Sequence, residues 1–218
     1  MKRLFLFSGI LVSVFFCLSY TTACSIVHGS GKMITEKRAL SGFSGVAAGG
    51  AIELELSQAD SYSVEVEADE NVIGKVQTFV ENGTLKIEMK ETDLFENTKV
   101  HVKVTTPVIN LIGIRGASRG NARDIKTEKL NIEVSGASKL VVTGTAKQVN
   151  SEVSGASKLD AKNLISEIAS VECSGASTAK VHVNTSLKID AAGASNVTYS
   201  GNPQITKETR GASNIAQE

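Results

Sequence analysis

The chain has 218 residues with a formal net charge of zero, because its 23 basic residues balance its 23 acidic ones. This balance excludes the electrostatic footprint of a nucleic-acid-binding protein or of a protein that binds an anionic membrane face. Hydrophobic residues make up 41% of the chain, but only 5% are aromatic, none is Trp and 19 are Gly. Small and β-branched side chains in this proportion indicate tightly wound β structure rather than a roomy ligand cavity.

The N-terminus has the features of a secretory signal peptide. Two basic residues and an apolar run over residues 4–18 precede Ala23-Cys24, and the run is too short to span a membrane comfortably. A small residue directly before a Cys resembles a bacterial lipobox, except that Thr21 stands where an aliphatic residue is usual. We expect residues 1–23 to be removed and Cys24 to be lipidated; ordinary cleavage after Ala23 is the alternative.

A lipid on Cys24 would anchor the chain in a membrane. We therefore expect an outer-membrane lipoprotein of the bacterial cell envelope. Residues 24–36 contain Gly29-Ser30-Gly31, and we interpret them as a flexible tether. Cys173 would then be the only unmodified cysteine of the mature chain, and we expect it to pack as a small hydrophobe rather than to act as a nucleophile.

Residues 37–218 form one predicted all-β domain, which begins with a strand-rich N-terminal cap over residues 37–106. Polar and apolar residues alternate with a period of two, which is typical of strands with one wet face. Asn82-Gly83 predicts a type I′ hairpin, and residues 69–75 predict a short helical turn.

A repeated Gly-Ala-Ser tripeptide organises residues 107–218. The six glycines are separated by 20, 19, 20, 18 and 18 residues; they are Gly116, Gly136, Gly155, Gly175, Gly193 and Gly211. A period of this size predicts a parallel β-helix, or β-solenoid, of about six coils with 18–20 residues each. The positions two and four before each Gly are mostly apolar, which predicts inward columns. We expect the Ala after each Gly, such as Ala156, to face the interior and the following Ser157 to face solvent.

An outward column of acidic residues stands three positions before the glycines. Its members are Glu133, Glu152, Glu172, Asp190 and Glu208. Stacked carboxylates repel one another, so either basic neighbours or a cation ladder would offset them, and Ca²⁺ takes oxygen ligands of this kind. We expect a solvated face without metal, balanced by lysines, because charge rows are usually surface. The candidate lysines are Lys129, Lys139, Lys158 and Lys188.

Three motifs carry a resemblance to a known family. The repeated Ser-Gly-Ala-Ser-Lys blocks, the segment Tyr199-Ser200-Gly201-Asn202-Pro203 and the early Phe43-Ser44-Gly45-Val46 resemble the head domain of putative auto-transporter adhesins. This domain of unknown function is common in Bacteroidetes lipoproteins, and the match runs from about residue 37 to the C-terminus. The resemblance implies a largely parallel β-helix without catalytic residues. Surface-exported lipoproteins of that phylum tend to carry acidic residues after the lipidated Cys, and residues 25–29 have none, so a periplasm-facing anchor stays open beside surface display.

Three classes of function follow from these features. The first is a non-catalytic binding or adhesion module whose solenoid face takes a glycan or a surface protein. The second is a structural envelope protein that self-associates. The third is a polysaccharide lyase or hydrolase of the β-helix kind, but the carboxylates form a regular ladder rather than a pair in a cleft, and the three His residues lack metal-ligand spacing. We expect the first class, with no enzymatic activity and no cofactor.

Overall fold

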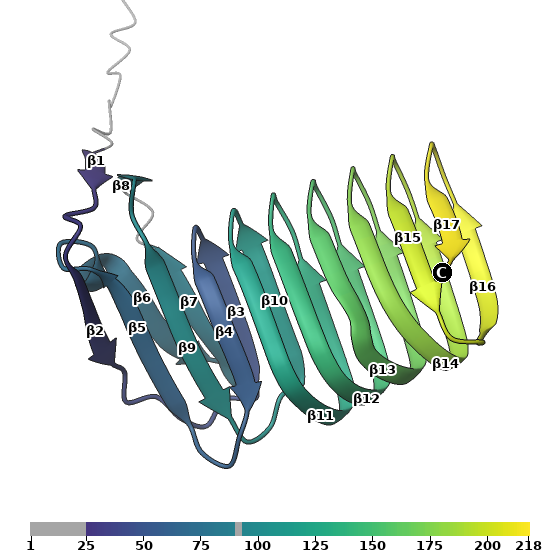
Figure 1. Cartoon of the computed structure of the whole chain (residues 1–218), viewed down its shortest axis with the longest axis horizontal. Coiled ribbons are helices and arrows are strands. Elements are labelled where there is room, and N and C mark those ends of the chain that lie inside the picture. Colours follow the sequence, from purple (N-terminus) through teal and green to yellow (C-terminus); the bar gives the residue numbers. More distant parts are fainter. Residues whose placement is uncertain (1–24, 90–92) are drawn as a thin grey trace, which may run out of the picture.

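The structure is a computed structural model that describes residues 25–89 and 93–218. Nearly all of this part of the chain is β structure, and 15 of its strands join into one hydrogen-bonded network. The network winds into a solenoid of about 5 turns (Figure 1). The predicted all-β solenoid is therefore confirmed. The predicted signal peptide and Cys24 lie outside the described residues.

The N-terminal elements alternate between short strands and tight turns. They are β1 (Ser25–His28), β2 (Met33–Lys37), β3 (Gly45–Gly50), β4 (Glu53–Gln58), β5 (Ser63–Asp69), the 3₁₀ helix η1 (Ile73–Lys75), β6 (Val76–Glu81), β7 (Thr84–Met89), β8 (Asp93–Glu96) and β9 (Val100–Thr106). Asn82 and Gly83 have φ of 50° and 73° and connect β6 to β7 as an antiparallel hairpin. These angles fit a type I′ turn, so the predicted hairpin is confirmed, and η1 is the predicted helical turn.

Long strands then form the coils. They are β10 (Leu111–Gly116), β11 (Arg119–Val134), β12 (Lys139–Val153), β13 (Lys158–Cys173), β14 (Thr178–Ala191), β15 (Asn196–Ser200), β16 (Gln204–Thr209) and β17 (Asn214–Gln217). Each of β11 to β14 bends midway, so one coil contributes a segment to each of two stacked layers. In Figure 1, β3 and β10 of one layer point up, whereas β4 and β9 of the other point down. The Gly-Ala-Ser corners connect the two layers.

The coils begin earlier than residue 107, within the region that we predicted as the N-terminal cap of the domain. Strand β3 pairs in parallel with β10, which places Gly50 beside Gly116, and β4 pairs in parallel with β11. Gly50-Ala51 is thus a further corner of the same kind. The repeat pattern did not reveal it because β5 to β9 are inserted after it and Ile52 replaces the Ser. Strands β7 and β9 stack in parallel on the outer side of this coil.

The interpretation of residues 24–36 as a flexible tether is wrong for the described part of this segment. Strand β2 pairs antiparallel with β5 over its full length. Upstream of it, the Gly31 amide donates a hydrogen bond to Oδ1 of buried Asp69 at 2.7 Å, and the Asn71 side chain bonds the backbone of His28 and Ser30. The segment is therefore bound to the body of the protein, and we name the Asp69 contacts the N-terminal latch.

The Gly-Ala-Ser corners stack directly on one another along the solenoid. Gly155 has φ of +76°, and a Cβ atom on it would lie 2.6 Å from the backbone oxygen of Gly136 in the preceding coil. The other five corner glycines have φ between +75° and +80° and equally close contacts. Glycine is required here for two reasons, because L side chains disfavour this φ and because the coils leave no room for a Cβ atom.

The expected orientation of the two residues after the Gly is reversed. Ala156 is exposed, whereas Ser157 is fully buried, and the other middle coils show the same arrangement. The Ser157 hydroxyl donates to the backbone oxygens of Ser154 at 2.6 Å and Val134 at 3.1 Å. Even-numbered positions counted from the Gly stay inward through the corner, so the inward site falls on Ser, and in this coil the Ser157 hydroxyl supplies a donor to carbonyl groups beside the turn.

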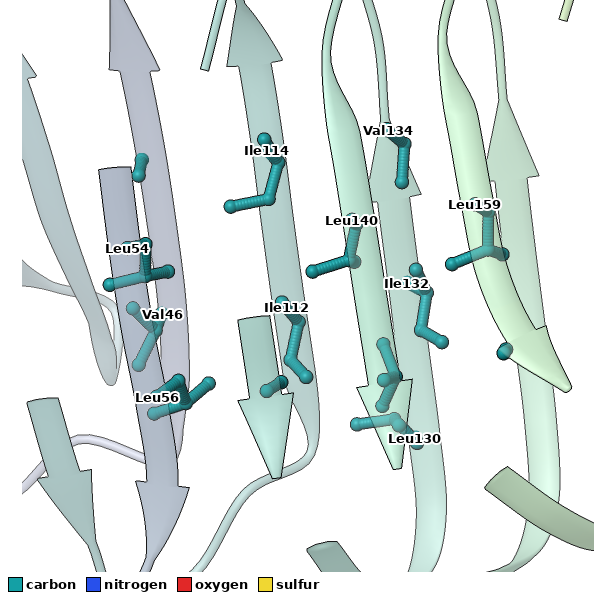
Figure 2. Close-up of a cluster of buried hydrophobic side chains, with 14 of the residues drawn as sticks. Val46, Leu54, Leu56, Ile112, Ile114, Leu130, Ile132, Val134, Leu140 and Leu159 are labelled. Carbon is teal, nitrogen blue, oxygen red and sulfur yellow. The ribbon is translucent and has the colours of Figure 1, made fainter. Parts of the chain in front are cut away.

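Aliphatic side chains fill the space between the two layers. Leu140 and Leu159 of one layer pack against Ile132 and Val134 of the other (Figure 2), and all four are at most 1% exposed. At the C-terminal end, Lys207 and Thr209 replace the Ile189 and Ala191 of the preceding coil in the inward columns. Polar residues at these positions suit an end coil that faces solvent on one side.

Candidate functional site

The five acidic residues singled out from the sequence lie side by side. The parallel ladder pairs Glu133 with Glu152, Glu152 with Glu172, Glu172 with Asp190 and Asp190 with Glu208. Asp190 is half-buried and the other four are exposed. Adjacent strands of a sheet lie about 4.8 Å apart, so the column presents one carboxylate at each such step. The structure thus brings together all five predicted residues in one outward row.

A second row of polar residues runs alongside the acidic row, and we did not predict it from the sequence. Asn131, Asn150 and Ser170 stand two residues before the glutamates of the same coils, and Asn150 Nδ2 donates to Asn131 Oδ1 at 3.1 Å. The two rows line an open groove of about 350 Å³. We name it the acidic groove and define it by Asn131, Asn150, Ser170, Glu133, Glu152 and Glu172. The missed signal was available: the position five before each Gly is polar in every coil from 131 onward.

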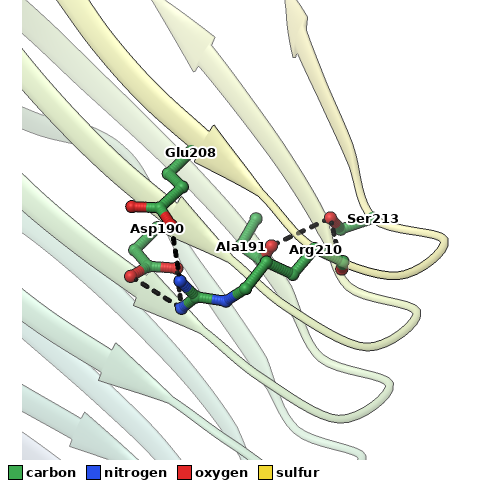
Figure 3. A network of polar contacts seen from close by, with 5 residues as sticks. All are labelled: Asp190, Ala191, Glu208, Arg210 and Ser213. Atoms are coloured by element: carbon green, nitrogen blue, oxygen red, sulfur yellow. Dashed lines mark hydrogen bonds and ion pairs between the residues drawn. The ribbon is translucent and has the colours of Figure 1, made fainter.

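Arginine balances only the C-terminal end of the acidic column. Arg210 bonds both carboxylate oxygens of Asp190, at 2.7 and 2.9 Å, and that of Glu208 at 2.6 Å (Figure 3). The hydrogen bond with Asp190 is the main cause that raises the pKa of Arg210, and the charges of both carboxylates add to it. This network fixes the last two coils to each other at the end of the row.

Of the four lysines that we expected to balance the row, Lys129 and Lys188 lie on the strand segments that carry it, whereas Lys139 and Lys158 do not. Within residues 25–89 and 93–218, the three glutamates of the groove make no ion pair. Lys139 and Lys158 lie beyond the corner, in the opposite layer, where they pair in register with each other and with Arg119. All three are exposed. We name Arg119, Lys139 and Lys158 the basic column; Arg119 contacts Glu53 at 3.6 Å.

Residues 42–203 match the family described as putative auto-transporter adhesin, head GIN domain. The chain belongs to this family. The match covers most of the chain and confirms the resemblance seen in the repeated motifs. Family membership supports an adhesion-type role at the cell surface or envelope and favours a non-enzymatic protein.

Solved structures of other putative adhesins share the fold of this head GIN domain. A putative adhesin from Bacteroides fragilis is 19% identical with a TM-score of 0.65, and the alignment covers 88% of this chain and 100% of that one. A second, from Parabacteroides distasonis, is 20% identical with a TM-score of 0.55 over 89% and 100% of the two chains. A search of curated proteins found no match.

The other candidates for chemistry in this domain are the thiol of Cys173 and possible metal ligands. Cys173 is buried in the core, and burial raises the pKa of its thiol to about 11, with the Ser177 hydroxyl acting in the opposite direction. The thiol is therefore protonated at neutral pH, a poor state for a nucleophile. Among the residues that the structure describes, no three His, Cys, Asp or Glu side chains are placed to hold a metal ion, and no helix could cross a membrane.

Proposed function

We propose that this chain is a non-catalytic adhesion module whose acidic groove binds a glycan or a surface protein. The observation that carries the proposal is the row Glu133, Glu152 and Glu172, exposed on consecutive coils and without an ion-pair partner among the described residues. Each neighbouring pair of carboxylates costs on the order of 1 kcal/mol of repulsion in water. A ligand with hydroxyl, amide or cationic groups would relieve this repulsion while it bonds the row.

The geometry suits binding better than catalysis. The strands fix the spacing of the carboxylates before a ligand arrives, so binding does not have to order them. Acid–base catalysis needs two groups whose environments push their pKa values apart. Here the glutamates share one exposed environment on one face. The polysaccharide lyase alternative therefore has no support from this groove.

We further propose that the module is held in the cell envelope by a lipid on Cys24, as an outer-membrane lipoprotein. Cys24 directly precedes β1, and the latch holds the following residues on the domain. Mass spectrometry of the protein from its own membrane should show an acylated N-terminal Cys24. Cys24→Ser should release the protein from the membrane fraction. A mature chain with a free amino terminus on an unmodified Cys24 would contradict the anchor.

The groove is tested by neutralising its carboxylates. The mature chain should bind a subset of glycans or matrix proteins in an array screen. The triple variant Glu133→Gln, Glu152→Gln and Glu172→Gln should bind the same ligands at least about tenfold more weakly, because hydrogen bonds to charged groups are worth about 1.5–3 kcal/mol each. The matched control is Lys139→Gln with Lys158→Gln, on the opposite layer, which should bind as the unmodified chain does. Unchanged affinity in the triple variant would overturn the proposal.

A further inference from the structure

The acidic and basic residues on the two layers come from one heptapeptide that occurs twice without change. Glu-Val-Ser-Gly-Ala-Ser-Lys spans residues 133–139 and again residues 152–158. In each copy the Glu stands three residues before the corner Gly and the Lys three residues after it. Since the corner turns the chain from one layer to the other, the Glu and the Lys point out of opposite layers. Because each stands three residues from the corner Gly along its own strand, both lie about equally far from the Gly-Ala-Ser edge of the solenoid.

The two charged columns therefore have the same spacing. The ladder pairs Glu133 with Glu152 and Lys139 with Lys158. All four side chains are exposed, and none makes an ion pair within the described part of the chain. One layer thus carries a row of two glutamates and the other a row of two lysines. The two rows have the same spacing between successive residues and the same separation from the corner Gly.

We propose that the acidic face of one molecule packs on the basic face of a second copy. A translation across the thickness of the solenoid brings Glu133 and Glu152 of one copy opposite Lys139 and Lys158 of the next, coil by coil. A two-fold axis would instead set like charges against each other. The contact is therefore heterologous and leaves both outer faces of a pair open, so it generates stacks rather than closed dimers. This inference rests on the proposed function and names a partner for the acidic face.

The surroundings of the basic column allow this contact. Arg119 extends the row toward the N-terminal end but is held by Glu53, and Thr178 continues it on the other side. In the next outward column, Asp160 and Lys180 have opposite signs. Because exposed ion pairs are individually weak and screened by salt, association should be modest in solution and should depend on ionic strength. Molecules tethered side by side on one surface would gain from their high local concentration.

Sedimentation velocity of the mature chain tests the stack. We expect concentration-dependent species larger than a monomer at about 20 mM salt and their loss at about 500 mM, where the Debye length is a few ångströms. Two charge-reversed variants follow: Glu133→Lys with Glu152→Lys, and Lys139→Glu with Lys158→Glu. Each alone has two faces of like sign and should stay monomeric. Mixed in equal amounts they should associate again, which also shows that both are folded.

The outcomes separate the stack from ligand binding. A wild-type chain that stays monomeric at low salt, single variants that associate like the wild type, or a mixture that does not associate would each overturn the inference. The variant with Lys139→Glu and Lys158→Glu keeps its acidic groove and should still bind the array ligands. Ligand binding without stacking would refute the inference and leave the proposed function in place, whereas unchanged ligand affinity in the Gln triple variant would overturn the proposed function.

Discussion

Gly155→Ala is expected to lower the free energy of unfolding of the solenoid by about 3 kcal/mol. Two costs add up at this corner. The backbone has φ of +76°, where an L residue costs roughly 1–2 kcal/mol. The new Cβ would also meet the Gly136 oxygen at 2.6 Å, and that oxygen accepts the Ala156 amide at 2.8 Å, so it cannot move without loss of a ladder hydrogen bond. Overpacking of this kind costs about 1–3 kcal/mol.

Two control variants separate these costs in urea unfolding experiments. Gly42 has φ of +77°, but no atom of the described residues lies within 4 Å of an added Cβ, so Gly42→Ala should cost only the conformational part, about 1–2 kcal/mol. Ala156→Leu, next to the corner but exposed, should change stability by less than about 0.5 kcal/mol. Equal losses in the two glycine variants would show that the contact between coils has no energetic weight.

Asp69→Ala should produce a loss of similar size near the N-terminal end of the described chain. Its carboxylate is 3% exposed and accepts the amides of Gly31 at 2.7 Å and Lys99 at 3.2 Å. Hydrogen bonds to charged groups contribute about 1.5–3 kcal/mol each, and their loss would leave donors of the latch without a partner. We expect about 3 kcal/mol of destabilisation by urea unfolding and faster proteolytic cleavage within residues 25–37.

Asp60 provides the matched comparison for the latch. It is exposed and makes no polar contact within the described residues, so Asp60→Ala should leave both stability and cleavage unchanged. If Asp69→Ala lowers stability but residues 25–37 stay resistant to protease, Asp69 supports the cap without holding the N-terminal segment.

The columns of the solenoid could be predicted because the period fixes them. Once the Gly residues were aligned, the ladder had to place Glu133, Glu152 and Glu172 side by side, as observed. The orientation of the corner was wrong for a physical reason. Side-chain size suggested that Ala belongs inside, but the alternation through the turn decides the matter, and buried Ser157 satisfies carbonyl groups that an Ala could not.

The rest depended on contacts between distant parts of the chain. The coil formed by β3 and β4 pairs with strands more than sixty residues later, and β2 pairs with β5, so no local period marks either. The layer on which Lys139 and Lys158 lie was also not predicted from the sequence. Lys139 and Lys158 are outward like the glutamates, and only the turn at the corner places them on the other layer.

The self-stacked corners have a consequence for how such proteins change over generations. Because each coil contacts mainly the coils before and after it, duplication or loss of one repeat leaves every column continuous. When the repeat is one that carries the heptapeptide Glu-Val-Ser-Gly-Ala-Ser-Lys, the same event adds or removes one carboxylate on one side and one lysine on the other. Repeat number thus sets molecular length and the number of charged groups together. A longer descendant would bind more tightly because it repeats the same contacts more often, and no new type of contact would be needed.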